Sequence, residues 1–234
     1  MTNCGQRTLG EMNNRFFTIA VAALCFAFMT EAALAHPHQW IDMRSQLIVS
    51  DDGMITGLRV EWKMDKGYTA EALDGLKKTA DGNYSAADLQ SLTEENLGAL
   101  ADYGYFVFFR FNDEKQKIGN PFDGLQTYNP NDDRLTLLFS VPLVQPLDPH
   151  KGAVTLKVYD PEFYIDFEYV DSKPILISKP LSNGCSASLL PIPKGSQLED
   201  TRMMLASKDK VWKPDQAEDY GGLFAQPVEV KCAP

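Results

Sequence analysis

The sequence IDMRSQLIVSDDGMITGLRVEWKM, residues 41–64, contains two runs in which apolar and polar side chains alternate. The apolar side chains of the two runs are Ile41, Met43, Leu47, Val49, Leu58, Val60, Trp62 and Met64. Between the runs lies Asp51-Asp52-Gly53, and two runs of period two around an Asp-Gly pair are typical of a β-hairpin. We therefore expect a hairpin with one apolar face and one polar face.

Short alternating runs with turn residues between them continue towards the C-terminus. They cover residues 103–112, 125–128, 135–141, 153–159, 163–169, 175–177 and 228–232. Many short strands with regular turns predict a mainly β, β-sandwich-like domain. Glu162, Asp166 and Glu168 share one face of the strand expected around 163–169. They could bind a hard cation or meet the histidine edge, and for Asp166 and Glu168 we favour a solvated outer face.

One segment, residues 66–101, has helical spacing instead, with leucines on either side of the twelve residues 77–88. A glycine at the sixth place of these twelve and a carboxylate at the last resemble an EF-hand calcium loop. The side chains of such a degenerate calcium loop would be those of Asp81, Asn83, Ser85 and Asp88. Lys77 and Thr79 replace the acidic residues expected first and third, so calcium binding is not expected. The fold class is therefore α+β overall, with an inserted helix-loop-helix of EF-hand-like form.

The N-terminal residues have the pattern of an export signal. Arg15 precedes the apolar run 16–29, and Ala33-Leu34-Ala35 has the small-x-small form that signal peptidase cuts. We expect residues 1–35 to be a cleaved signal peptide and residues 36–234 to be a single β-rich periplasmic domain. No other apolar run approaches the ~20 residues of a membrane span, so the processed chain is not expected to cross a membrane.

The charge balance excludes some classes of partner. The 234 residues include 22 basic and 32 acidic side chains, and cleavage would remove two of each, so the net charge of −10 would not change. An acidic chain argues against nucleic acid as a partner, and it suits both attraction of cations and ordinary solubility. No nucleophile elbow, phosphate-binding glycine loop or His-Glu-x-x-His motif is present, so no enzyme activity is expected. The true start, Met1 or Met12, stays open.

Cysteine usage follows from the expected cleavage. Cys4 and Cys25 would leave with the signal peptide, and Cys185 and Cys232 would remain. An even pair in an exported chain predicts a disulfide bond, and a pair of metal-binding thiolates is the alternative.

Cleavage would also create a candidate metal site. His36 would become the N-terminal residue and would offer a metal both its α-amine and its imidazole, and His38 follows two residues later. Residues two apart in a strand project to the same side, roughly 6.5–7 Å apart, so both imidazoles can reach one ion. Pro37 has no N–H, which prevents the square-planar site built from an amine and two deprotonated amides. A polar strand start without metal explains the same residues.

A site on two imidazoles needs one or two ligands from elsewhere in the chain. Asp160 and Glu162 are our candidates, because Asp160 precedes a proline at a strand end, where a turn cap and a metal ligand look alike. Imidazole suits zinc, copper and nickel alike, so the identity of the divalent ion among Zn²⁺, Ni²⁺, Co²⁺ and Cu²⁺ stays open.

Two motifs together resemble a known bacterial family. His-Pro-His-Gln-Trp-Ile-Asp, residues 36–42, follows a leader, and residues 158–167 read VYDPEFYIDF after the helical insertion. This combination is similar to proteins usually labelled the periplasmic component of an uncharacterised ABC-type transport system. Members of that family resemble partners of nickel/cobalt-type transporters. The resemblance implies handling of a transition metal beside an inner-membrane transporter, and the sequence departs from the family's more acidic loop at Lys77 and Thr79.

Two function classes follow from these residues. The first is a periplasmic metal-binding accessory protein that delivers or buffers Zn²⁺, Ni²⁺, Co²⁺ or copper for a transporter. The second is a copper redox protein or copper carrier with a histidine brace formed by N-terminal His36. A brace needs a second histidine from elsewhere in the fold, and His150 is the remaining candidate.

Overall fold

Residues 41–64 form the predicted hairpin. In the computed structural model, which describes residues 37–182, 184–208, 212, 215 and 219–233, β1 (Gln39–Val49) and β2 (Ile55–Met64) pair antiparallel. Met43 lies opposite Trp62 and Leu47 opposite Leu58, and the odd positions of β1 are all buried. The alternation of apolar and polar residues therefore predicted both the pairing of these strands and the face that packs inward.

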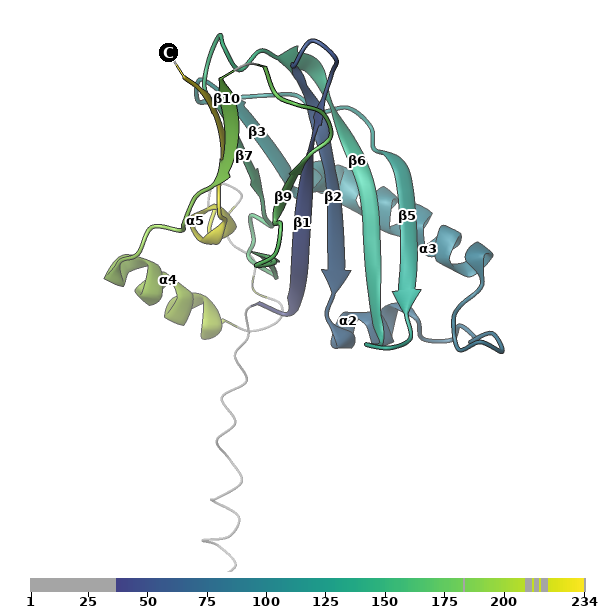
Figure 1. Ribbon diagram of the computed structural model, residues 1–234. Coiled ribbons are helices and arrows are strands. Elements are labelled where there is room, and N and C mark those ends of the chain that lie inside the picture. The colour runs from purple at the N-terminus through teal and green to yellow at the C-terminus, as the bar shows by residue number, and fades with distance from the viewer. Residues whose placement is uncertain (1–36, 183, 209–211, 213–214, 216–218, 234) are drawn as a thin grey trace, which may run out of the picture. The chain divides into compact units, whose positions relative to one another are not determined.

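The protein is mainly β with a few helices, as predicted, and its strands form two sheets (Figure 1). The larger sheet has the order β5 (Phe122–Asn129), β6 (Arg134–Leu147), β2, β1 and β8 (Ile165–Tyr169), and β9 (Ile175–Ile177) also pairs with β1. The smaller sheet has the order β10 (Cys185–Leu189), β11 (Val228–Cys232), β7 (Val154–Val158), β3 (Val107–Phe111) and β4 (Glu114–Lys115). Both β8 and β9 run parallel to β1.

The two sheets share one hydrophobic core, in which Trp62 of β2 is among the largest fully buried side chains. The Trp62 ring lies 4.9 Å from the Phe139 ring of β6 and 4.9 Å from the Phe167 ring of β8, centroid to centroid. The smaller sheet contributes Val107, Phe109, Val154, Leu156, Val158, Val228 and Val230 to the same core. Packing of apolar faces from both sheets thus orders the whole described unit.

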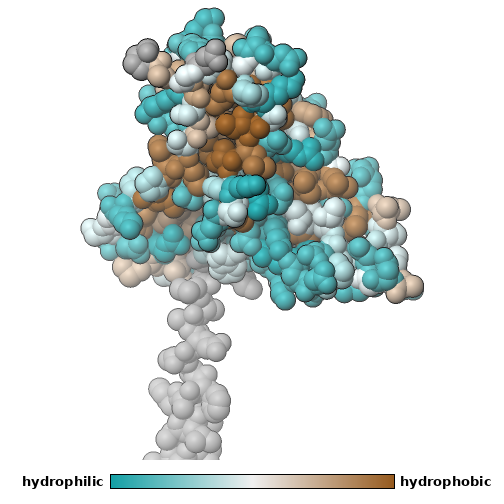
Figure 2. All heavy atoms as spheres, in the orientation of Figure 1, coloured by the Kyte–Doolittle hydropathy of each residue, from teal (hydrophilic) through white to brown (hydrophobic). Residues whose placement is uncertain are grey.

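Apolar side chains also reach the surface on the face shown in Figure 2. Leu176 and Ile177 of the short strand β9 are more than a third exposed. Figure 2 shows hydrophobic atoms gathered in the region where Figure 1 places β9 and β10.

The helical segment follows β2, as its leucine spacing predicts. Helix α2 (Lys66–Ala72) and helix α3 (Ala86–Leu100) are separated by a loop, and a 3-10 turn (Ala101–Phe106) leads into β3. Helix α3 packs closely on β5, because a Cβ at Gly124 would lie 2.6 Å from Leu97 Cδ1. Asn96 of α3 donates a hydrogen bond to Gln126 of β5 at 3.0 Å.

A second, smaller hydrophobic cluster lies beside β8. It joins Phe163 to Leu205 of α4 (Ser196–Ala206) and Phe224 of α5 (Gly221–Phe224). Strict alternation would group Phe163 with the strand that follows it. The backbone of Phe163 instead has φ of +55°, which interrupts the extended conformation before β8 begins and turns the ring towards the helices.

The position of helix α4 over β8 shows that one interpretation of the sequence is wrong. The expectation that Asp166 and Glu168 form a solvated outer face is wrong for Asp166, which is only 9% exposed. Arg202 of α4 lies over it, with 3.9 Å between the guanidinium and the carboxylate. Glu168 is exposed, as expected. The weakly amphipathic helix α4 gives no sequence signal of which strand it covers.

The predicted disulfide is present between Cys185 of β10 and Cys232 of β11, which lie directly opposite each other in the ladder. It ties the closing strand to the sheet edge and is compatible with an extracytoplasmic location. In the described part of the chain, no helix combines the length and the apolar character needed to cross a membrane.

The close approach of β2 to β6 generates a stability prediction. A Cβ at Gly57 would lie 2.5 Å from the carbonyl oxygen of Val141, so Gly57→Ala should lower the free energy of unfolding by about 1–3 kcal/mol. Gly98→Ala is the matched control, because a Cβ at Gly98 of helix α3 would meet no neighbouring element within 4 Å. That variant should gain up to about 1 kcal/mol. Urea denaturation measures both, and equal stability of Gly57→Ala and the parent would contradict the close approach.

Candidate functional site

The start of β1 lies beside the turn that precedes β8. His36 lies outside the described residues. The His38 N–H donates to the Tyr164 carbonyl oxygen at 2.8 Å, and the two rings are 4.6 Å apart between centroids. Parallel pairing then begins with Gln39 opposite Ile165. The fold therefore brings His38 to the turn at residues 160–164, more than a hundred residues later in the chain.

His38 is half-buried, and its Nε2 atom has almost no contact with solvent. Coordination by His38 therefore requires either its Nδ1 atom or a rotation of the ring. On the other side of the segment, the Trp40 N–H donates to Asp65 Oδ2 at 2.9 Å. Contacts to Tyr164 and to Asp65 together fix the backbone at His38 and Trp40.

The Asp160 side chain caps the turn that precedes β8. Its Oδ1 atom accepts the N–H of Glu162 at 3.0 Å, and its Oδ2 atom accepts the N–H groups of Tyr164 and Ile165 at 2.9 and 3.1 Å. Burial raises the pKa of the Asp160 carboxyl, against the three backbone hydrogen bonds, which favour the charged form. Of the two roles that the sequence leaves open for Asp160, the structure shows the turn cap.

Glu162 is half-buried and lines an apolar cavity of about 360 Å³. Within the described residues, its carboxylate has neither a hydrogen bond nor an ion pair. Trp62 and Asn96 line the same cavity, and no described residue accepts a hydrogen bond from the buried Trp62 indole N–H. Glu162 is therefore the carboxylate of the turn that remains available to a ligand.

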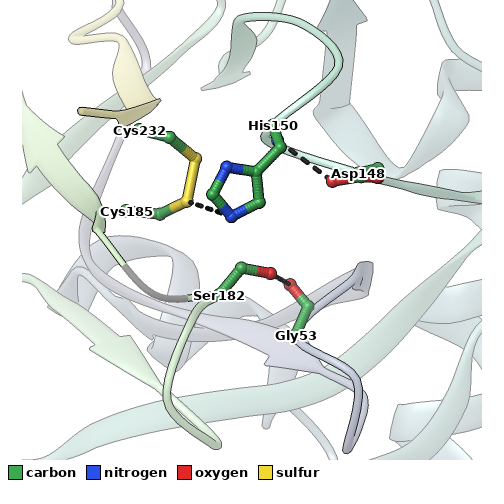
Figure 3. The surroundings of a disulfide bond; sticks show 6 residues. All are labelled: Gly53, Asp148, His150, Ser182, Cys185 and Cys232. Carbon is green, nitrogen blue, oxygen red and sulfur yellow. Dashed lines mark hydrogen bonds between the residues drawn. A yellow bond between two sulfur atoms is a disulfide. The ribbon is translucent and has the colours of Figure 1, made fainter. Parts of the chain in front are cut away.

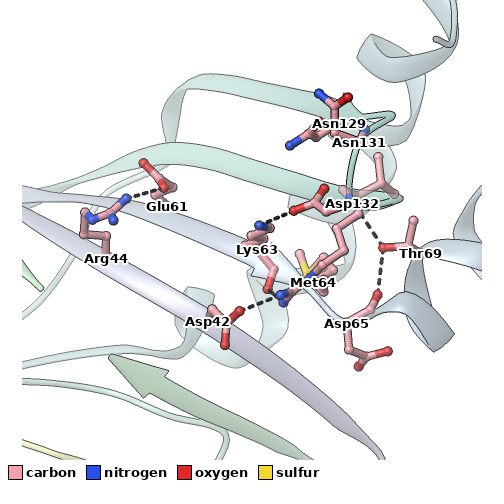
Figure 4. A network of polar contacts seen from close by, with 12 residues as sticks. Asp42, Arg44, Glu61, Lys63, Met64, Asp65, Thr69, Asn129, Asn131 and Asp132 are labelled. Atoms are coloured by element: carbon pink, nitrogen blue, oxygen red, sulfur yellow. Dashed lines mark hydrogen bonds and ion pairs between the residues drawn. The ribbon is translucent and has the colours of Figure 1, made fainter. Parts of the chain in front are cut away.

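Asp42, on the same side of β1 as His38, is held elsewhere (Figure 4). Arg134 donates to Asp42 Oδ2 at 2.6 Å and to the carbonyl oxygens of Lys63, at 2.8 Å, and Met64. Lys63 in turn pairs with Asp132. This network joins β1, β2 and the β5–β6 turn and occupies the Asp42 carboxylate, so Asp42 belongs to the sheet surface rather than to the histidine segment.

The predicted ligands do not form a complete set by themselves. Among the described residues, one group of three has potential ligand atoms that all lie within 4.8 Å of one another, and it consists of His150, Cys185 and Cys232. His38, Asp160 and Glu162 do not form a second such group there. A site on the His-Pro-His segment therefore needs His36 as well.

Sequence reasoning missed the proximity of His150 to the disulfide. His150 lies in an exposed turn and reads as a loop histidine, and its Nε2 atom lies 3.6 Å from Cys185 Sγ. No local pattern in the sequence places the 148–152 turn beside β10, because the contact depends on how the sheets pack.

The side chains of the EF-hand-like loop bond to the loop itself. Ser85 caps helix α3 by accepting the Asp88 N–H at 3.1 Å, and its hydroxyl donates to Asp88 Oδ2 at 2.6 Å. The Thr79 hydroxyl donates to Asp81, which lowers the pKa of the Asp81 carboxyl. Asn83 Oδ1 accepts the N–H of the next residue. These contacts make a tight turn followed by a capped helix.

Comparison with known proteins gives the family. A family model described as "Protein of unknown function (DUF1007)" matches residues 21–232. The chain belongs to this family. An uncharacterized protein of Haemophilus influenzae is 26% identical over 213 residues, which cover 88% of this chain and 95% of that protein. The region matched by the family model includes the histidine segment, the turn at Asp160 and both cysteines of the disulfide.

Burial of Asp166 generates a pH prediction. Burial and then nearby Glu168 raise the pKa of the Asp166 carboxyl, although Arg202 lowers it. The folded state therefore binds this proton more tightly than the unfolded state, and stability from this group falls as pH rises from about 3.8 through the folded pKa. The free energy of unfolding of Asp166→Asn, minus that of the parent, should rise over this interval in urea titrations.

Asp51→Asn is the control of opposite sign. A hydrogen bond from Lys179 lowers the pKa of the Asp51 carboxyl. The free energy of unfolding of Asp51→Asn, minus that of the parent, should therefore fall or stay flat as pH rises. A flat difference for Asp166→Asn would show that its carboxyl is solvated after all.

The loop generates a calcium prediction. Millimolar Ca²⁺ should leave the Tm unchanged, because we expect the loop not to bind it. A ligand present at 100 times its Kd would instead stabilise the fold by ~2.7 kcal/mol and shift Tm by several degrees. The double variant Lys77→Asp/Thr79→Asp supplies acidic residues at the first and third places, and its Tm should respond to Ca²⁺. A clear Tm shift in the parent would contradict this prediction.

Proposed function

We propose that this protein is a periplasmic metal-binding accessory protein of a transition-metal transport system, which holds Zn²⁺, Ni²⁺ or Co²⁺ at the start of β1. The observation that carries the proposal is the hydrogen bond from the His38 N–H to the Tyr164 carbonyl oxygen, which joins His38 to the turn that contains Glu162. Two imidazoles and a carboxylate form a mixed nitrogen and oxygen set that suits a reversibly held divalent ion.

The proposed ligands are His36, through its α-amine and imidazole, His38 and Glu162. Asp160 supports this set as a positioning residue, because its buried carboxylate binds the three N–H groups that shape the turn around Glu162. Second-sphere hydrogen bonds of this kind orient metal ligands. The chain's net charge of −10 favours the approach of a cation.

The surface around the segment supports a docking role for the same edge. Trp40 and Tyr164 flank His38 and are 50% and 45% exposed. Exposed aromatic side chains beside a polar site are common where proteins bind one another. We propose that this edge faces the inner-membrane transporter, to which the ion is delivered.

The copper-brace alternative lacks its second histidine in this arrangement. His150 lies near Cys185, and Ser182, three residues before that cysteine, donates to the Gly53 carbonyl oxygen in the β1–β2 turn. That turn is at the far end of β1 from His38, roughly 30 Å away for a strand of this length. His150 therefore cannot complete a brace with His36, and the accessory function is favoured.

The proposal predicts that binding depends on His38 and on processing. Zn²⁺ or Ni²⁺ titration by calorimetry of protein that starts at His36 should show one site, and His38→Ala should weaken it at least tenfold, or about 1.4 kcal/mol. A residue added before His36 should also weaken it, because the amine is then blocked. His150→Ala is the matched control and should bind as the parent does. Equal affinity of His38→Ala and the parent would contradict the proposal.

A further inference from the structure

His150, Cys185 and Cys232 form a compact group at the exposed edge of the smaller sheet (Figure 3). Potential ligand atoms of the three side chains all lie within 4.8 Å of one another. Figure 3 shows the imidazole of His150 pointing at the disulfide from the turn above Ser182 and Gly53. The group belongs to a different end of the fold from the His-Pro-His segment.

The positions of the two cysteines do not depend on the disulfide alone. Strands β10 and β11 pair over five positions, from Cys185 opposite Cys232 to Leu189 opposite Val228. The N–H of Ala233 donates to the Gly184 carbonyl oxygen at 2.8 Å, just beyond the cysteines. Backbone pairing thus keeps both sulfur atoms side by side when the S–S bond is open.

His150 is also placed by its own turn. Its N–H donates to Asp148 Oδ1 at 3.0 Å, and the Lys151 N–H donates to the Asp148 carbonyl oxygen at 3.0 Å. Three potential ligands therefore lie on backbone that is ordered without a metal.

We propose that this group is a second, redox-gated metal site, in which Cys185 and Cys232 as thiolates and His150 through Nε2 bind one Zn²⁺ ion after the disulfide is reduced. The reductant is a dithiol: it gives two electrons and two protons to the disulfide, and it becomes a disulfide itself while two thiols form. Zn²⁺ then displaces one proton from each thiol as two Zn–S bonds form.

Distances in the group fit tetrahedral zinc. Zn–S bonds of ~2.3 Å and Zn–N bonds of ~2.0–2.1 Å at the tetrahedral angle separate sulfur from nitrogen by about 3.6 Å. The structure has 3.6 Å between His150 Nε2 and Cys185 Sγ. The two sulfur atoms must move apart to about 3.8 Å, which opening of the S–S bond allows. Because His150 is exposed, a water molecule can take the fourth position.

The oxidised protein cannot bind zinc in this way, since disulfide sulfur atoms are not thiolates. The group would therefore hold metal under reducing conditions and release it on oxidation. This site does not rest on the function proposed above, because it uses none of the residues of the His-Pro-His segment.

Cobalt titration of the His38→Ala variant with an added N-terminal residue tests the proposal, because that background removes the other candidate site. The protein is reduced with dithiothreitol, which is then removed under oxygen-free conditions. Circular dichroism checks that the reduced protein is still folded. Reduced protein should then bind one Co²⁺ with a thiolate-to-cobalt charge-transfer band, and Zn²⁺ should remove the band. Oxidised protein should give no band.

Two further variants assign the ligands. Cys185→Ser/Cys232→Ser should lose the band, and His150→Ala should keep a weaker band with at least tenfold lower affinity. Asp148 stays unchanged in both, so the turn is preserved. Three results would overturn the proposal: a reduced, folded protein without the band, a His150→Ala variant with undiminished affinity, or a reduced protein that unfolds and does not refold on adding Zn²⁺.

Discussion

The parallel pairing of β1 with β8 is the constraint on which the rest of this structure depends. Strand β1 has β2 on one edge, as a hairpin partner, and β8 and then β9 on the other. Without β8, the hairpin would have an open edge, and Phe167 would not reach the ring of Trp62. The same pairing places His38 against Tyr164. One set of backbone hydrogen bonds therefore closes the core and brings His38 to the turn that precedes β8.

Local patterns in the sequence predicted the secondary-structure elements but not which elements pack against one another. The hairpin, the helix at Ala86–Leu100 and the Cys185–Cys232 disulfide follow from alternation, leucine spacing and cysteine counting. Burial of Asp166 did not, because it depends on α4, whose sequence does not specify a partner strand. The contact of His150 with Cys185 likewise arises only from packing of distant segments.

The same limit applies to the candidate site, where the sequence predicts the residues but not the contacts of each one. Sequence alone selected the histidine segment and the turn at Asp160, and the fold brings them together. The sequence could not show which of Asp160 and Glu162 caps the turn, because a capping carboxylate and one that is open to a ligand have the same chemistry. The distinction comes from burial and from the three N–H groups on Asp160, which leave Glu162 as the carboxylate without a partner among the described residues.

The topology of β1 also sets an order of events during synthesis. Ser45 of β1 and Tyr169 at the end of β8 share a hydrogen bond although 124 positions separate them. A chain that emerges from its N-terminus first therefore presents β1 long before its parallel neighbour exists. Until that neighbour arrives, one edge of β1 has no partner strand, and the finished sheet covers that edge only afterwards.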